Sequence, residues 1–361
     1  MITALVRLRK ELTKNKLDAA LISSVSNITY LTNYSGFSKE EREAYLFITE
    51  DKQYVLTDGR YSQAVKTLIP DFELIEISSK NPVKEMLKNL KLKHKIKNLG
   101  FEGHNISFLE HKKLLQRFDD SNHRSFDFLR SVKTSDEISK IEQACKLGDK
   151  TFTHILKFIK KGISEKELAF KIEFFIKKNG GELSFPSIIA FGKNSAAPHH
   201  QTSDKRLMTK DKFVLLDFGV KLNNYCSDMT RTVFFGKPTR EQRKIYQTVL
   251  NAQQKALEHL GRWRGNDLDS SEVDRIARDY IISKGYKTIP HSLGHGIGID
   301  VHEAPHLSPK SKDILKVGMV FSIEPGVYIP DFGGVRIEDL VALEKNKIRL
   351  ITTSPKKIIE L

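Results

Sequence analysis

The chain has 361 residues, more than one ordinary hydrophobic core organises, so its length predicts two domains. Hydrophobic residues make up 39% and charged residues 29%, a balance typical of a globular protein and not of a disordered chain. The formal net charge is +15, but the lysines are scattered without an aromatic-interleaved basic motif. This favours a lysine-rich solvated surface over a specific nucleic-acid site.

The N-terminal residues and the spacing of the two cysteines bear on where in the cell the protein resides. Charges interrupt the apolar residues of MITALVRLRKELTKNKLDAALI, and no later apolar run approaches the roughly 20 residues of a membrane span. Cys145 and Cys226 lie far apart, which argues against a disulfide framework. We therefore expect a cytoplasmic protein with no membrane partner.

The first third of the chain alternates helical and strand-like patterns. Leu5, Leu8 and Leu12 have helical spacing within a predicted helix 2–16. Further expected elements are strands at 19–23, 28–32, 44–49, 53–58 and 97–102 and helices at 60–68 and 82–91. This alternation predicts an α/β domain over residues 1–132, in which no catalytic constellation is visible.

The remaining residues, 133–361, are predicted to form an α+β domain. Capping boxes, in which side chains satisfy the first helix amides, mark three helix starts. They are Thr134 with Glu137, Ser164 with Glu167, and Thr239 with Gln242. The expected helices are 135–160, one from 164 to near 180, one from 239 and one at 270–284, and the expected strands are 213–220, 225–235, 319–329 and 335–343.

Residues 291–305, HSLGHGIGIDVHEAP, hold three histidines, His291, His295 and His302, among three glycines. Histidine is the commonest metal ligand in proteins and titrates near neutral pH. Glycine lets a backbone approach a ligand closely. The alternative is a glycine-containing loop with satisfied histidines, and carboxylates elsewhere must decide between the two.

Two aspartates lie in the segment FVLLDFGVKLNNYCSDMTRTVFF at 213–235. A carboxylate in an apolar strand is costly to bury unless it is paired or bound to a metal. A hairpin turning at Leu222–Asn223 sets Asp217 directly opposite Asp228. A turn at Asn223–Asn224 makes them diagonal neighbours, and either register puts both on one face. The alternative is a capping or turn role for each aspartate.

Two glutamates, Glu324 and Glu338, are expected to be paired in the same way across a loop in the segment SIEPGVYIPDFGGVRIEDLVAL at 322–343. A register symmetric about Asp331 sets Glu324 opposite Glu338. Arg336, two residues from Glu338 on the same strand face, is placed to orient carboxylates. Exposed alternating charge on an edge strand is the alternative. Four carboxylates and one imidazole suit two divalent cations about 3.5–4 Å apart, and favour manganese, cobalt, iron or zinc over copper.

The ordered motifs DFG…YCSDMTRT, HSLGHGIGIDVHE, SIEPG and GGVRIED resemble those of the pita-bread-fold metallopeptidases, in the branch of Xaa-Pro aminopeptidase and prolidase. The resemblance covers essentially the whole chain and implies a creatinase-like N-terminal domain before the catalytic domain. It implies two metal ions bound by Asp217, Asp228, His295, Glu324 and Glu338. PHH at 198–200 matches the family's upstream histidine, which places His199 in the site and leaves His200 structural.

The resemblance also implies a role for each residue. Asp228 and Glu338 would bridge both ions, Asp217 would bind one, and His295 with Glu324 the other. A metal-bridging water would be the nucleophile, and Glu324 would pass its proton to the leaving nitrogen. His199 and His302 would hold the substrate carbonyl and the oxyanion, His291 would contact the peptide, and Arg336 would hold the ligands in place.

These features predict an exopeptidase that releases an N-terminal residue preceding proline. A dipeptidase must also bind the proline carboxylate, commonly with an arginine after the HE motif, where this chain has His306. Aminopeptidase activity is therefore favoured over dipeptidase activity. Methionine aminopeptidase lacks such an N-terminal domain, creatinase lacks the metal carboxylates, and a noncatalytic binding module would be expected to have lost ligands. The resemblance further implies a homodimer or larger assembly, with the N-terminal domain helping to wall the site.

Overall fold

A computed structural model describes residues 2–115, 118, 120–264, 267–345 and 347–361. The chain divides into two compact units, Met1–Leu129 and Arg130–Leu361. The sequence prediction placed the domain boundary after residue 132. Within the described residues, no helix is both long enough and apolar enough to cross a membrane.

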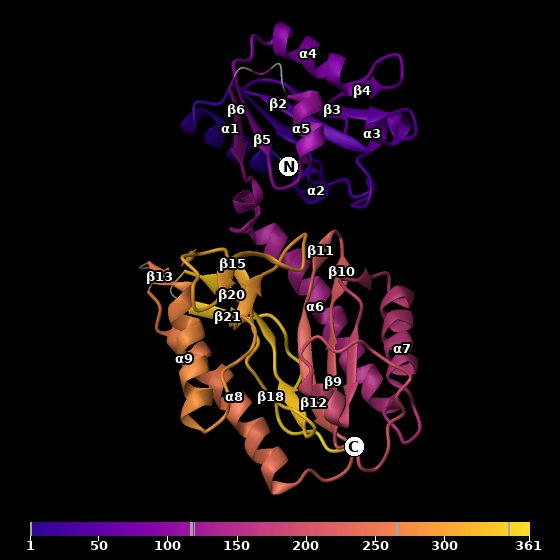
Figure 1. The fold of residues 1–361 in the computed structure, drawn as a ribbon, viewed down its shortest axis with the longest axis vertical. Coiled ribbons are helices and arrows are strands. Elements are labelled where there is room, and N and C mark those ends of the chain that lie inside the picture. The colour runs from indigo at the N-terminus through magenta and orange to yellow at the C-terminus, as the bar shows by residue number, and fades with distance from the viewer. Residues whose placement is uncertain (1, 116–117, 119, 265–266, 346) are drawn as a thin grey trace. The chain divides into compact units, whose positions relative to one another are not determined.

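The first unit is a six-stranded sheet with helices packed against it (Figure 1). The strand order is β4-β3-β2-β1-β5-β6, and β1 runs parallel to β5 and antiparallel to β2. The strands are β1 Ala19–Ile22, β2 Ala44–Thr49, β3 Gln53–Asp58, β4 Glu73–Ile77, β5 Asn98–Glu102 and β6 Asp120–Arg124. The helices are α1 Ile2–Lys14, α2 Val25–Thr32, α3 Ser62–Leu68, α4 Val83–Lys93, α5 Phe108–Leu114 and the 3₁₀ turn η1 Asp127–Arg130.

Successive residues of β1 bury into two different apolar clusters. Ile22 packs in the cluster that contains Leu8 of α1, whereas Leu21 packs in the one that contains Leu87 of α4. Neighbouring side chains of a strand point to opposite faces, so helices cover both faces of this sheet. This explains why the strand reads as a continuous apolar run.

The strand predicted at 28–32 is wrong, because these residues belong to helix α2. Val25, Ile28 and Leu31 have helical spacing, and Asn33 ends the helix in the left-handed region with φ 60°. The β-branched residues of ITYLT suggested a strand, but tertiary packing of one helical face overrides that preference. The other strands predicted for this unit are confirmed.

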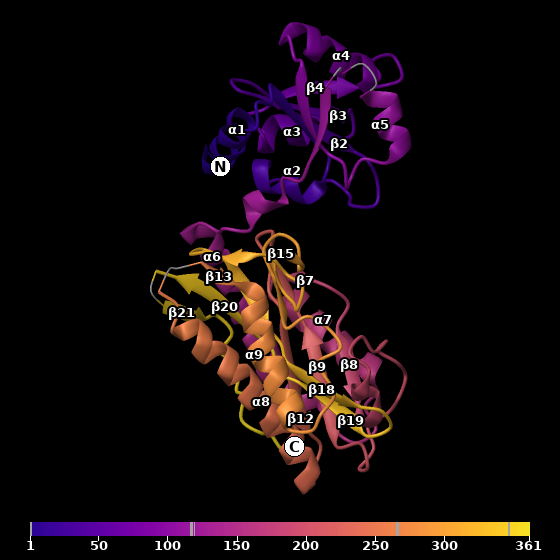
Figure 2. The same cartoon turned by 60° about the vertical axis from the view of Figure 1, so that its left-hand side comes forward.

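Four capped helices frame the second unit. They are α6 Ser135–Ile155, α7 Glu165–Lys178, α8 Arg240–Gly261 and α9 Ser270–Ser283. The three predicted capping boxes are confirmed, with both hydrogen bonds of each box present. Helices α8 and α9 run side by side on one flank of the strands, and α7 lies on the other flank (Figures 1 and 2). The short 3₁₀ turns are η2 Leu156–Phe158 and η3 Gly192–Ala196.

Two antiparallel sheets carry the polar segments. One has the order β12-β9-β8, with β8 Ile188–Phe191, β9 Phe213–Phe218 and β12 Met229–Phe234. The other has the order β15-β14-β17-β20-β21, with β14 Gly294–Gly296, β15 Glu303–Leu307, β17 Val320–Ile323, β20 Asp339–Glu344 and β21 Lys347–Leu350. Smaller pairings join β18 Gly326–Ile329 to β19 Gly333–Arg336, β10 Val220–Leu222 to β7 Glu182–Leu183 and β11 Tyr225–Cys226, and β13 Leu268–Asp269 to β16 Ile314–Leu315.

The two large sheets meet where β12 passes the segment before β20. The backbone N–H of Glu338 donates to the carbonyl of Thr230 at 3.1 Å, and the hydroxyl of Thr232 donates to the carbonyl of Arg336. Helices α6 and α7 bury apolar residues with the first sheet, and α8 and α9 do so with the second. The strands between them therefore hold their polar residues on the remaining, inner side.

Candidate metal centre

The first pair of carboxylates is set by a continuous hairpin register. Lys221 pairs with Cys226, and Thr230 pairs with Asp217. The turn residues Asn223 and Asn224 have φ 51° and 70°, which a primed two-residue turn requires. The predicted register with its turn at Asn223–Asn224 is therefore confirmed, and Asp228 is the diagonal neighbour of Asp217. Both aspartates are buried.

The second pair is set by a register symmetric about Asp331, as predicted. Ile323 pairs with Asp339 on one side, and Gly326 pairs with Arg336 on the other. Glu324 and Glu338 lie between these pairs and so face each other across the two segments. Asp331 itself has φ 61°, in the left-handed region at the tip of the loop.

His295 lies on β14, which is pressed against both neighbouring strands. A Cβ on Gly294 would lie 1.9 Å from the carbonyl oxygen of Ser322, and a Cβ on Gly296 would lie 2.2 Å from that of Ala304. Only glycine permits this approach. The sequence suggested that these glycines face a ligand, but here they let β14 fit between β15 and β17.

The imidazole of His295 is oriented by its own strand. Its Nδ1 lies 3.1 Å from the carbonyl oxygen of Gly296, which can only accept, so Nδ1 carries the proton. Nε2 is then left with a free lone pair, 3.3 Å from Glu324 Oε1 and 3.7 Å from Asp228 Oδ2. This is the tautomer that a metal ligand needs.

The four carboxylates and the imidazole of His295 line one cavity of about 440 Å³. The lining includes the nine residues that the sequence indicated for the site: His199, Asp217, Asp228, His291, His295, His302, Glu324, Arg336 and Glu338. Phe185, Ile188 and Val301 add an apolar wall, and His306 also lines the cavity. Segments from Phe185 to Glu338, which are far apart in the chain, therefore converge on this cavity.

Charge and burial test whether a metal fits these residues. Burial, reinforced by repulsion from neighbouring carboxylates, raises the pKa of Asp228 and of Glu324 well above the ordinary value and that of Glu338 to about 7. Within the described part of the chain, Asp228 Oδ1 and Glu338 Oε1 have no hydrogen-bond partner. Ligand atoms of Asp228, His295 and Glu338 all lie within 4.8 Å of one another. Carboxylates that repel each other, two of which keep a buried oxygen without a donor, fit a divalent cation.

Burial also keeps His291, His295 and His302 neutral. It lowers the pKa of His295 to about 3 and that of His291 to about 4, and it lowers the pKa of His302. A neutral imidazole offers the lone pair that a metal binds or a proton that a carbonyl oxygen accepts.

A chain of hydrogen bonds joins His291 to the carboxylates of the cavity. The hydroxyl of Tyr328 donates to Nε2 of His291 at 2.8 Å, because the Nδ1 proton of that ring is given to the carbonyl of Ser292. Arg336 donates to Tyr328 at 3.0 Å and to Asp217 at 2.5 Å. Thr230 accepts from Arg336 Nε and donates to Glu338 at 2.7 Å.

Tyr328 and Thr230 were missed from the sequence. Thr230 could have been found, because it follows Asp228 by two positions and so shares its strand face. No sequence pattern indicates Tyr328, because its hydrogen bonds to His291 and Arg336 form only in the folded chain.

His200 has the structural role that the sequence suggested. Its Nε2 lies 2.8 Å from Glu165 Oε2, outside the cavity lining. Glu165 is fully buried and also accepts hydrogen bonds from the backbone N–H of Phe191, from Asn194 and from Ser203. These contacts hold the segment that carries His199.

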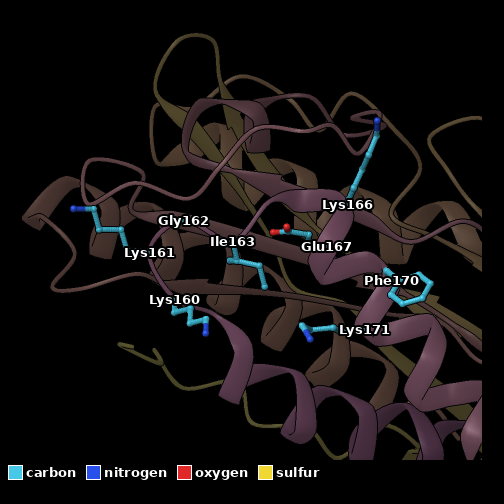
Figure 3. Close-up of a pocket in the computed structure, with 8 residues that line it drawn as sticks. All are labelled: Lys160, Lys161, Gly162, Ile163, Lys166, Glu167, Phe170 and Lys171. Atoms are coloured by element: carbon cyan, nitrogen blue, oxygen red, sulfur yellow. The ribbon is translucent and has the colours of Figure 1, made fainter.

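A second hollow, at the corner of α6 and α7, does not resemble a binding centre. Four lysines line it, Lys160, Lys161, Lys166 and Lys171, together with Phe170. Their ammonium groups point in different directions and do not converge on one point (Figure 3). Lys166 pairs with Asp204 at 2.7 Å, and Lys171 lies over the ring of Phe158. These lysines behave as a solvated surface.

Known proteins match the chain over both units. Residues 139–345 match Metallopeptidase family M24, and residues 5–132 match the Creatinase/Prolidase N-terminal domain. An Xaa-Pro dipeptidase of Pyrococcus furiosus is 35% identical over 366 residues, covering 98% of this chain and 99% of its own. The structure of an Xaa-Pro dipeptidase from Bacillus anthracis has a TM-score of 0.91 at 35% identity and covers 100% and 99% of the two chains. An X-Pro aminopeptidase from Thermotoga maritima has a TM-score of 0.84 at 32% identity, covering 96% and 98%.

Proposed function

The chain belongs to metallopeptidase family M24, with a creatinase-like N-terminal domain and a pita-bread catalytic domain, and we propose that it is an Xaa-Pro aminopeptidase that removes the N-terminal residue of peptides with proline in the second position. The observation that carries this proposal is the convergence of four carboxylates, three of them buried and that of Glu324 partly buried, and one neutral imidazole on one cavity. The names of the relatives support the choice of Xaa-Pro bonds.

Asp217, Asp228, His295, Glu324 and Glu338 would hold two divalent metal ions. The two oxygens without hydrogen-bond partners among the described residues, on Asp228 and Glu338, are free to bind such ions. Manganese is our first choice, with cobalt, zinc or iron as alternatives, because oxygen ligands predominate. Such ions supply a nucleophilic water at neutral pH and polarise the scissile carbonyl.

The proton of the attacking water goes to a carboxylate of the chain. Glu324 Oε1 accepts from Ser322 at 3.2 Å and faces His295, so its orientation is held. We assign it as the base that takes this proton and returns it to the leaving proline nitrogen, which has no hydrogen of its own in the peptide.

The imidazoles on the open side of the cavity orient the substrate. His199 and His302 would donate to the substrate carbonyl and to the oxyanion that develops from it. His291 is held rigidly on the side where the scissile bond would lie. Its Nε2 accepts a hydrogen bond from Tyr328, and its Nδ1–H donates one to the carbonyl of Ser292. The apolar wall of Phe185 and Ile188 suits a proline ring.

The lining favours aminopeptidase over dipeptidase activity. Its one guanidinium, on Arg336, is engaged by Asp217, Thr230, Tyr328 and the carbonyl of Pro198. Among the described residues that line the cavity, the other side chains able to carry a positive charge are histidines, so the carboxylate of an Xaa-Pro dipeptide would find no free guanidinium or ammonium group there. A dipeptidase remains the alternative, because two of the relatives described above carry that name.

Turnover of an Xaa-Pro-Yaa tripeptide, an Xaa-Pro dipeptide and an Xaa-Ala-Yaa tripeptide, with manganese present, tests the proposal. We expect the first to be cleaved fastest. Glu324→Ala should lose about 10³-fold in kcat, the size of a general-base effect, whereas Glu173→Ala, exposed on α7, should not change it. A strong preference for the dipeptide would overturn the aminopeptidase assignment, and an active Glu324→Ala variant would overturn the role of Glu324. We further propose a homodimer in the cytoplasm.

A further inference from the structure

Glu303 follows His302 directly but points the opposite way. The side chain of His302 is exposed in the cavity, whereas that of Glu303 is only 1% exposed. Among the described residues, the imidazole of His302 makes no hydrogen bond. Its ring packs edge to face against that of His295, with the two ring centroids 4.2 Å apart. The position of His302 therefore depends on its backbone and on what anchors the next residue.

The backbone of the turn before Glu303, residues 298–302, packs against the carboxylate of Glu303. The backbone N–H of Asp300 donates to Glu303 Oε1 at 3.0 Å, and that of Gly298 donates to the carbonyl of Asp300. A Cβ on Gly298 would lie 2.7 Å from Glu303 Oε2. The third glycine of the motif GHGIG thus leaves room for this carboxylate.

Two cations from the start of the second unit complete the cluster. Arg130 Nη1 donates to Glu303 Oε1 and lies 3.1 Å from Asp300 Oδ2, and Lys133 Nζ lies 3.3 Å from Glu303 Oε2. Lys133 is held in turn by a backbone bond from its N–H to the carbonyl of Gly318. Two positive and two negative charges balance in a place where at most a quarter of any of these side chains is exposed.

We propose that Glu303, clamped by Arg130 and Lys133, is the positioning residue that holds His302 over the cavity. The inference rests on the proposed function, in which His302 contacts the substrate carbonyl. A buried carboxylate with one backbone donor and two cations has a single low-energy position, because any displacement leaves charges unpaired. Since Glu303 and His302 are adjacent, fixing one fixes the backbone of the other.

Lys133→Met tests the clamp while keeping most of the buried volume. It leaves Arg130 facing two carboxylates, so the turn at 298–303 should shift. We expect kcat on the Xaa-Pro tripeptide to fall about 10- to 100-fold, as for other residues that orient a site from outside, with a smaller change in KM and unchanged metal content. Hydrogen exchange of the amides in 298–303 should become faster, a readout that needs no activity.

A double variant distinguishes positioning from general destabilisation. Lys133→Met with Glu303→Gln restores the charge balance and keeps an acceptor for Asp300 and Arg130, so kcat and exchange protection should recover beyond those of Lys133→Met alone. Should Lys133→Met not fold, Glu303→Asp keeps the charge but withdraws the carboxylate, and the same two losses are expected. Arg42→Met, which breaks the ion pair with Glu110 in the first unit, is the matched control and should leave kcat and the turn unchanged.

Unchanged kcat together with unchanged exchange at 298–303 in a folded Lys133→Met or Glu303→Asp variant would overturn the inference. Absence of any Xaa-Pro cleavage by the unaltered protein would instead overturn the proposed function. In that case hydrogen exchange still decides whether the cluster holds the turn.

Discussion

At the scale of single residues, the proposed metal ligands are held in place by side chains that are not themselves proposed ligands. Arg336 reaches Asp217, Thr230, Tyr328 and the carbonyl of Pro198 with three nitrogens of one guanidinium. A lysine could not replace it, because its single ammonium lacks the planar fork. Thr230 passes this constraint to Glu338 through its hydroxyl. The carboxylates are thus preorganised before any ion arrives.

Glu165 gives a prediction that depends on pH. Burial by itself raises the pKa of this carboxyl, but hydrogen bonds from Ser203, His200 and the N–H of Phe191 outweigh it, and the pKa lies below the ordinary value. A carboxyl with a lowered folded-state pKa stabilises the fold above its unfolded pKa of about 4.3, and this stability is lost as the pH falls through the folded-state pKa. Glu165→Gln should therefore cost about 2 kcal/mol at pH 7 and progressively less below pH 4.

Urea unfolding of the unaltered protein and of Glu165→Gln at pH 7 and at pH 3.5 measures this difference. Glu173→Gln, which removes only a surface ion pair with Lys177 on the same helix, is the control and should change the stability by no more than about 0.5 kcal/mol at either pH. An equal stability difference at the two pH values would show that the charge of Glu165 is not what stabilises the segment around His199.

The sequence and the structure agree best where a motif concentrates the chemistry in a few positions. Asp217 and Asp228 could be paired from the sequence because either register of the predicted hairpin puts both on one face, and the structure has the register with its turn at Asn223–Asn224. Glu165 could not be assigned, because its donors lie 26 to 38 positions away and meet it only when β8 and the following loop pack on α7. Local sequence patterns therefore identify candidate ligands, whereas the residues that hold these candidates in place are identified only by tertiary contacts.

At the scale of elements, the predicted strand 319–329 is in fact two strands in different sheets. β17 ends at Ile323 and pairs with β20, whereas β18 begins at Gly326 and pairs with β19. Pro325 lies between them and has no N–H to continue a ladder. The break places Glu324 where the chain leaves one sheet for the other, which no periodicity in the sequence reveals.

The tight fit of β14 gives a second prediction. Gly294→Ala would bring a Cβ to within 1.9 Å of a backbone oxygen of β17. That oxygen cannot move away unless the hydrogen bonds between β17 and β20 are disturbed. We expect a loss of about 3 kcal/mol in the free energy of unfolding and weaker metal binding, because His295 is the next residue. Thermal unfolding and metal titration of the purified variant measure both effects.

Gly261→Ala is the matched control for this change. Gly261 ends α8, and nothing lies within 4 Å of a Cβ at that position. Alanine favours a helix over glycine by up to about 1 kcal/mol, so this variant should be unchanged or slightly more stable. If both alanine variants behave alike, the close approach of β14 to β17 is not the reason for the glycine.

At the scale of the whole molecule, a strongly basic chain encloses an acidic centre. The net charge is +15, but four carboxylates meet in the cavity and only Arg336 among its lining residues carries a permanent positive charge. Burial of these carboxylates, together with repulsion among them, raises the pKa of Asp228 and opposes folding of the metal-free protein. Metal binding should therefore be linked to global stability, because the ligands come together only in the folded chain.

Stripping the protein with a chelator and restoring divalent cations one at a time tests this linkage. A ligand present at about 1,000 times its Kd stabilises the folded state by about 4 kcal/mol, so manganese at that ratio should raise the Tm by several degrees. Asp228→Asn removes a proposed bridging ligand and should lose most of this gain, whereas its metal-free Tm should be equal or higher, because one repelling carboxylate is gone. An equal rise in Tm for Asp228→Asn would place the ions elsewhere, and the cation that gives the largest rise at equal concentration identifies the preferred metal.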